Sequence, residues 1–148
     1  MTRRAPEHVA LHGRTFTITI DGPDDAHRYS AHISEPATGR MLTRTPVRGR
    51  SVDDVRGRAV DVIRNLTVIE RLQAEAVAAA AALAPGATVE LTEDAAAIRA
   101  DVSGAWTLDP PLSLSREEIT DPNADLDAWA AYVRDYLAAY LRPAAPSA

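Results

Sequence analysis

The fold of this chain is decided by residues 52–66, V-D-D-V-R-G-R-A-V-D-V-I-R-N-L, and by residues 126–140, L-D-A-W-A-A-Y-V-R-D-Y-L-A-A-Y. Each stretch has apolar residues at i, i+3, i+7, i+10, i+11 and i+14, which share one face of a helix with about 3.6 residues per turn. The two stretches therefore predict two amphipathic helices. Their apolar positions correspond at a constant offset of 74 residues: Val52, Val55, Ala59, Val62, Ile63 and Leu66 match Leu126, Trp129, Val133, Tyr136, Leu137 and Tyr140.

Strand patterns precede both helices at similar offsets, with Phe16 and Ile18 matching Val89 and Leu91, and Tyr29, Ala31 and Ile33 matching Ile98, Ala100 and Val102. We therefore predict an α+β fold of two quasi-repeated β-β-(β)-α units, with an antiparallel sheet and helices packed on one face. We expect a single domain over residues 1–148, with a first half at 14–84 and a second at 87–142. A unit of about 60 residues buries little apolar surface alone, so we expect the halves to share one core.

The clearest strand is T-F-T-I-T-I at residues 15–20, where threonine alternates with apolar residues. Residues 28–34 and 40–46 are predicted as further strands of the first half, and residues 1–13 as a loose arm. The second half has strand patterns at 88–92, 98–103, 106–108 and 112–114, and a tail at 143–148 that we expect to be disordered.

Residues 51–83 predict one long helix, with Ser51 as its N-cap and Asp53 and Asp54 in its first turn. Its 33 residues would extend about 50 Å, which exceeds what a small domain covers. Three alternatives stay open: a break near residues 67–70, a long helix laid across the sheet and followed by a connector, or an alanine-rich end that packs closely against another helix, for example from a second subunit.

The composition excludes several classes of protein. The chain has no cysteine, which removes disulfides and thiolate metal sites and fits a reducing compartment. No apolar run approaches the roughly 18 residues that span a bilayer, and the first 14 residues do not resemble a secretion signal. We therefore expect a cytoplasmic bacterial protein that is not associated with membranes.

Charge is distributed unevenly along the chain. Residues 1–72 contain twelve arginines and nine acids, whereas residues 73–148 contain four arginines and twelve acids. Such asymmetry indicates either an anionic partner for the first half or attraction between the halves or between two copies.

The densest basic segment supplies the candidate site: Arg40, Arg44, Arg48 and Arg50. Arginines on one strand face suit phosphates or a carboxylate-rich protein surface. The alternative interpretation is a solvated sheet edge. Exposed aromatic side chains, on which single-stranded nucleic acids stack, are not predicted beside these arginines.

Catalytic and metal-binding patterns are scarce. His8 and His12 have i, i+4 spacing, but nothing predicts a helix there, and His27 and His32 have opposite strand parity. The chain has no nucleophile, phosphate-loop or dinucleotide motif, and its paired acids lie in turns, loops and a helix start. We predict no enzyme, no cofactor and no metal.

Residues 15–66 resemble the partial RNase-H-like unit of HicB-type antitoxins. The resemblance depends on F-T-I-T-I at 16–20, on Y-S-A-H-I at 29–33 followed by a turn and Gly39, and on G-R-S-V-D-D at 49–54 leading to Ala59. It implies a module that binds a protein, typically a small RNA-cleaving toxin, through sheet and helix surfaces.

These observations give two functional hypotheses. The first is a non-catalytic protein-interaction or adaptor domain, with an antitoxin-like role as one form of it, that acts as a homo-oligomer or with a protein partner. The alternative is a nucleic-acid-binding module that uses the Arg40 to Arg50 segment, with binding that weakens steeply with salt.

Overall fold

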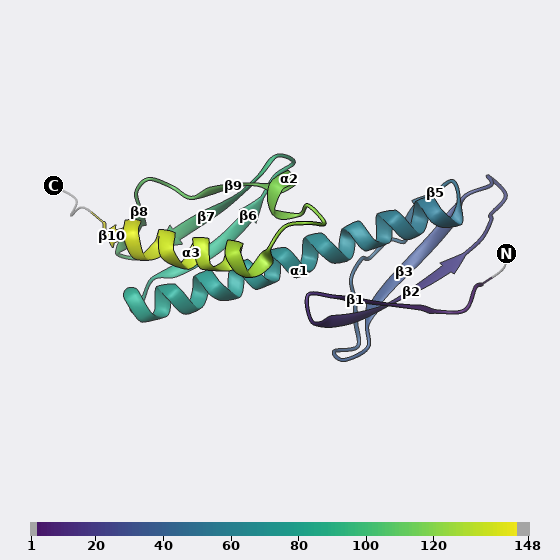
Figure 1. Cartoon of the computed structure of the whole chain (residues 1–148), viewed down its shortest axis with the longest axis horizontal. Coiled ribbons are helices and arrows are strands. Elements are labelled where there is room, and N and C mark those ends of the chain that lie inside the picture. Colours follow the sequence, from purple (N-terminus) through teal and green to yellow (C-terminus); the bar gives the residue numbers. More distant parts are fainter. Residues whose placement is uncertain (1–2, 145–148) are drawn as a thin grey trace. The chain divides into compact units, whose positions relative to one another are not determined.

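A computed structural model of the chain describes residues 3–144 and has an α+β fold, as the sequence predicts. The chain divides into two compact units, Met1–Thr67 and Val68–Ala148. One helix, α1 (Val52–Leu83), is continuous across the boundary and contributes residues to both units. Figure 1 labels the elements along the chain.

Unit 1 is an antiparallel sheet with the first part of α1 against it. Its strands are β1 (Glu7–Leu11), β2 (Arg14–Asp21), β3 (Tyr29–Glu35), β4 (Arg40–Met41) and β5 (Val47–Gly49). The order is β1-β2-β3, and β3 then pairs with both β4 and β5. The two strands expected at residues 15–20 and 28–34 are present as β2 and β3.

Two expectations for unit 1 are wrong. Residues 1–13 are not a loose arm throughout, because β1 pairs with β2 from Glu7↔Ile18 to Leu11↔Arg14. Residues 40–46 do not form one strand: β4 ends at Met41, and β5 begins only after Pro46, opposite the other end of β3. Proline cannot donate to a strand ladder, which fits the interruption at this position.

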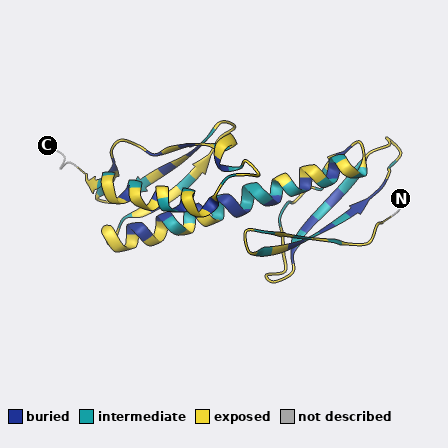
Figure 2. Ribbon diagram, viewed as in Figure 1, coloured by how far each residue is buried: buried dark blue, intermediate teal, exposed yellow. Residues whose placement is uncertain are grey.

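The core of unit 1 lies between one face of β2 and β3 and the first four turns of α1. The alternating residues of the threonine-rich strand place apolar side chains inward and threonines outward. Figure 2 shows the buried positions along β2, β3 and α1. The fully buried side chains of this cluster are Phe16, Ile18, Ile20, Ala31, Ile33, Val55, Ala59 and Ile63.

The beginning of α1 is capped as the sequence predicts. The Ser51 Oγ accepts a hydrogen bond from the backbone N–H of Asp54 at 3.0 Å. Gly49 lies directly beside this turn, and a Cβ atom there would come within 2.9 Å of the Val55 nitrogen. Glycine at residue 49 therefore allows β5 to pass closely over the helix start.

Unit 2 combines the second part of α1 with a three-stranded sheet of order β6-β7-β9. Its strands are β6 (Thr88–Glu93), β7 (Ala97–Ser103) and β9 (Ser113–Ser115), and a separate pair joins β8 (Trp106–Leu108) to β10 (Leu141–Pro143). The helices are α2 (Arg116–Ile119) and α3 (Leu126–Tyr140). The Asp125 side chain caps α3 by accepting from the Ala128 N–H.

The alanine-rich end of α1 packs into the core of unit 2. Ala76, Ala79 and Ala80 are buried in one cluster with Leu126, Val133 and Leu137 of α3. Ion pairs Arg71–Asp127 (3.0 Å) and Arg134–Glu75 (3.3 Å) also join the two helices, which Figure 1 shows side by side. Of the three alternatives, the break near residues 67–70 does not occur, and the neighbouring helix that covers the alanines belongs to the same chain.

The organisation of the core differs from the sequence expectation. The buried apolar residues form two clusters, one in each unit, rather than one shared core. The division falls between Thr67 and Val68, inside α1, whereas the sequence places it between residues 84 and 87. Because 32 helical residues extend about 48 Å, one helix can serve two small cores in succession. The quasi-repeat stays a prediction. The tail expected to be disordered at 143–148 is wrong at Pro143, which pairs with Trp106 in β10–β8, and residues 145–148 lie outside the described residues.

Candidate functional site

The four arginines of the predicted site are exposed, but unit 1 does not gather them into one patch. Arg40 pairs with Glu35 across β3–β4, whereas Arg48 pairs with Ser30 across β3–β5. Directly opposed residues share a face and successive residues of a strand alternate, so Arg40 and Arg48 belong to opposite faces. Arg44 lies in the segment between the two short strands.

Arg50 has a structural role at the beginning of α1. Its backbone N–H donates to Asp54 Oδ2 at 2.9 Å, and Arg58 Nε donates to Asp54 Oδ1 at 3.1 Å. Both bonds hold the pKa of the Asp54 carboxyl below its ordinary value, and the bond from the Arg50 backbone has the larger effect. The helix cap thus uses the backbone of Arg50, and the residue itself is exposed.

A shallow polar hollow lies on the open face of the unit 1 sheet. Its volume is about 600 Å³, and its lining residues are Arg3, Asp21, Ser30, His32 and Pro46. The Asp21 carboxylate accepts from Arg3 Nε at 3.0 Å and lies 3.9 Å from His32 Nε2. Within residues 3–144, no hydrogen bond joins Ser30 to His32. The sequence does not indicate this hollow, because Arg3 and Asp21 lie 18 residues apart.

The histidines do not form a metal site. His8 lies in β1, where its Nδ1 is 3.3 Å from the Thr17 hydroxyl, and His12 lies in the following turn with a positive φ of 51°. In the part of the chain that the structure describes, no group of three or more histidines and acids could hold a metal ion.

The most distinctive surface of unit 2 is a row of aromatic rings along α3, which we call the aromatic row: Trp129, Tyr132, Tyr136 and Tyr140. Successive ring centroids are 5.7, 6.1 and 4.6 Å apart, which are ordinary distances for interacting aromatic pairs. The whole chain has only seven aromatic residues, so this one helix carries most of them. Tyr132 is 48% exposed, and the other three rings are half-buried.

Tyr136 fixes the position of the aromatic row. Its hydroxyl donates to the carbonyl oxygens of Pro110 (2.7 Å) and Pro111 (3.2 Å), so the proline loop lies beside the rings. Burial is the main cause that raises the pKa of Tyr136, and Tyr132, Tyr140 and Asp109 add to it. The rings and prolines form a surface that is partly apolar and partly exposed.

A second feature of unit 2 is the outer edge of β6. The side-chain amide of Gln73, on α1, donates from Nε2 to the Val89 carbonyl at 2.8 Å and accepts at Oε1 from the Leu91 N–H at 2.6 Å. A groove of about 840 Å³ lies here between α1 and β6, lined by Ile69, Glu70, Gln73, Ala74, Thr88, Val89, Glu90, Leu91, Asp101, Val102 and Ser103.

Sequence reasoning found part of these surfaces. It placed Trp129, Tyr136 and Tyr140 on the apolar face of a helix, but it did not include Tyr132, whose spacing from Trp129 and Tyr136 is the signal for a continuous row. Nothing in the sequence points to Gln73, because its partners are backbone atoms 16 and 18 residues away.

The comparisons with known proteins give no relative. No protein-family model, curated protein or solved structure matches the chain. Among the described residues, none of the helices combines the length and the apolar character needed to cross a membrane.

Proposed function

We propose that this chain is a non-catalytic protein-interaction module, and that the aromatic row of α3 is its main docking surface. The observation that carries the proposal is the concentration of aromatic rings on one partly exposed helix face. Tyrosine and tryptophan dominate the energetic centres of protein interfaces, since they combine a large apolar area with a polar tip.

The neighbours of the row suit a protein surface. Ala128 and Ala139 are exposed on α3 next to the rings. Because alanine side chains are small, a partner can approach the α3 backbone closely beside the larger rings. Pro110 and Pro111 are also exposed, and their carbonyl oxygens accept from the Tyr136 hydroxyl, so they lie next to the row. The surface is therefore shaped for a helix or a flat protein face rather than for a small molecule.

Charge indicates the chemistry of the partner. Unit 2 contains five arginines and thirteen acids, a net charge of −8, whereas unit 1 contains eleven arginines and eight acids, a net charge of +3. Complementary charge accelerates association and disfavours wrong partners. The partner we propose is a basic protein in the cytoplasm, and the basic unit 1 of a second copy is one such surface.

The resemblance of residues 15–66 to HicB-type antitoxins is compatible with this proposal, because an antitoxin-like module binds a small RNA-cleaving protein. The nucleic-acid alternative has less support, since Arg40 and Arg48 lie on opposite faces of the sheet.

Photo-crosslinking tests the proposal. The photoreactive residue p-benzoylphenylalanine replaces Tyr132 in one variant and Met41 of unit 1 in another, and both are expressed in the cells that make the protein. Met41 is a matched control because it is 53% exposed, against 48% for Tyr132. We expect covalent protein adducts from position 132 that are several times more abundant than those from position 41.

Two further results sharpen the test. Trp129→Ala should reduce the adducts from position 132, because it removes the ring that supports Tyr132. The adduct mass separates a second copy, which adds 15.9 kDa, from a different protein. Equal adducts from positions 132 and 41, or none from 132, would contradict the proposal.

A further inference from the structure

At the outer edge of β6, a side-chain amide makes hydrogen bonds that a neighbouring strand would otherwise make. β6 pairs with β7 on one side only, and on the other side the Val89 carbonyl and the Leu91 N–H both bond to the Gln73 amide. In a strand, the N–H and C=O groups of residues i and i+2 all point to the same edge. A neighbouring strand would therefore hydrogen-bond to Val89 and Leu91. The Gln73 amide already occupies two of their backbone groups, the Val89 carbonyl and the Leu91 N–H.

The groove beside this edge has an apolar wall. Ile69 and Ala74 line it from α1, and Val89 and Leu91 line it from β6. One turn beyond Gln73 on the same helix, Val77 is 49% exposed, which is unusual for valine in this chain. Apolar side chains of an added strand would pack against this wall.

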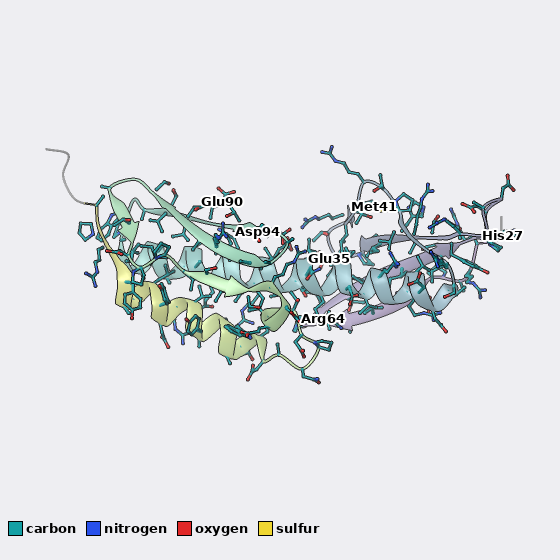
Figure 3. The ribbon with its side chains drawn as sticks, turned by 90° about the horizontal axis from the view of Figure 1, so that it is seen from above. His27, Glu35, Met41, Arg64, Glu90 and Asp94 are labelled. Atoms are coloured by element: carbon teal, nitrogen blue, oxygen red, sulfur yellow. The ribbon has the colours of Figure 1, made fainter. Side chains whose placement is uncertain are left out.

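The opposite face of the edge is acidic. Glu90 lies directly across from Asp101 in the β6–β7 register, and like charges in this position destabilise a sheet. Asp101 accepts a hydrogen bond from the Thr92 hydroxyl at 3.1 Å. Within residues 3–144 the Glu90 carboxylate has no ion-pair partner, and Figure 3 shows Glu90 extending away from α1.

We infer that the β6 edge binds an extended segment of a partner protein in which apolar and cationic residues alternate. The segment pairs with β6 through its main chain and displaces the Gln73 amide. Its apolar residues face Ile69 and Ala74, and its cationic residues lie beside Glu90 and Asp101 on the other face. A second copy of β6 is a poor occupant, because its sequence TVELTE contains no cationic residue to lie beside Glu90.

This inference goes beyond the proposed function because it concerns a different surface. The aromatic row lies beside the Pro110–Pro111 loop, whereas the groove lies at β6, the first strand of the sheet order β6-β7-β9. Either surface can therefore fail its test while the other passes.

The test is a titration of the full chain with a seven-residue peptide in which valine and arginine alternate. We expect saturable binding by calorimetry, and tighter binding by about tenfold to the Gln73→Ala variant, because the peptide no longer displaces two neutral hydrogen bonds. Glu90→Gln should weaken binding about threefold and reduce its salt dependence, whereas Glu117→Gln, an exposed acid of α2, should not.

Control peptides separate strand pairing from charge attraction. A valine–arginine peptide that is N-methylated at alternate residues keeps its charge but loses main-chain donors, and a valine–glutamate peptide keeps the donors but reverses the charge. We expect neither to bind. Amide exchange provides an independent readout: the Leu91 N–H should exchange faster in Gln73→Ala than in the wild type and become protected again when the peptide is added.

Four results would overturn the inference: no binding of the valine–arginine peptide, equal binding of the N-methylated peptide, equal binding of the valine–glutamate peptide, or unchanged affinity in a folded Gln73→Ala variant. Circular dichroism establishes that the variant is folded. If Gln73→Ala does not fold, the N-methylated and valine–glutamate comparisons on the wild-type chain decide the matter alone.

Discussion

The two units are built from similar elements but differ in what their surfaces do. In unit 1, charged side chains pair with one another: Arg14 with Glu35 at 2.9 Å, Arg56 of α1 with Glu7 of β1 at 2.8 Å and Arg3 with Asp21 at 3.0 Å. In unit 2, a row of rings is half-exposed and Glu90 faces another acid. Unit 2 also has ion pairs, for example Arg71–Asp127 and Arg134–Glu75, so the units differ mainly in the exposed rings and in the Glu90–Asp101 pair of acids, which a partner can satisfy.

The largest expected effects come from the two cores. Ile63→Ala in unit 1 and Leu137→Ala in unit 2 each remove a fully buried side chain, and each should lower the free energy of unfolding by about 2–5 kcal/mol. Hydrogen exchange distinguishes the units: Ile63→Ala should accelerate exchange mainly in β2 and β3, and Leu137→Ala mainly in β6 and β7. Equal acceleration of both sheets by both variants would show that the two clusters act as one core.

A smaller effect is expected where α1 packs on α3 in unit 2. Ala80 is 2% exposed, so Ala80→Leu should overpack this contact and lower the free energy of unfolding by about 1–3 kcal/mol. Ala78 is exposed on the same helix and is the matched control. Thermal denaturation of Ala78→Leu should give a melting temperature close to that of the wild type. If both variants have the same stability, the alanine surface of α1 is not closely packed.

The pH dependence of unit 1 should depend partly on Glu35. Arg14, through hydrogen bonds and charge, holds the pKa of the Glu35 carboxyl below its ordinary value. A lowered folded-state pKa contributes stability above the unfolded pKa, and this contribution is lost as pH falls through the folded pKa. Urea denaturation between about pH 7 and pH 3 should therefore show a smaller loss of stability for Glu35→Gln than for the wild type. Identical pH profiles would show that the Arg14 pairing does not stabilise the charged form.

The smallest effects are expected for the arginines that the sequence singled out. Arg44→Ala and Arg48→Ala replace exposed residues and should each change stability by less than about 0.5 kcal/mol. Because Arg48 does not share a face with Arg40, neither substitution should alter binding to single- or double-stranded oligonucleotides in a salt-titrated assay. Oligonucleotide binding that decreases steeply with salt and is lost in these variants would instead favour the nucleic-acid hypothesis.

Local patterns predicted the elements of this fold better than its organisation. The T-F-T-I-T-I alternation predicted β2, and the apolar stripes predicted α1 and α3. These predictions succeed because the spacing of apolar residues depends only on the geometry of a single helix or strand. The division at Thr67 could not be predicted, since no proline or glycine marks it and the helix continues through it. Similarly, β1 has only five residues, Glu7–Leu11, without alternating apolar positions, and its pairing depends on a partner strand.

The candidate surfaces show the same limit. Three of the four rings of the aromatic row were placed on one helix face from their spacing alone. The bonds of Gln73 to β6 depend on how a helix and a strand meet in three dimensions, and the separation of Arg40 from Arg48 depends on the register of two short strands. These contacts depend on tertiary structure, and the spacing of apolar residues along the sequence does not indicate them.

Hydroxyl-radical footprinting of Tyr132 and Met41 tests most directly whether unit 2, rather than unit 1, is the docking half of the molecule. The two side chains are about equally exposed in the isolated chain, so their oxidation can be compared in the purified protein and inside the cells that make it. We predict that oxidation of Tyr132 decreases several-fold in cells while that of Met41 is unchanged. Protection of Met41 with Tyr132 fully reactive would contradict the account.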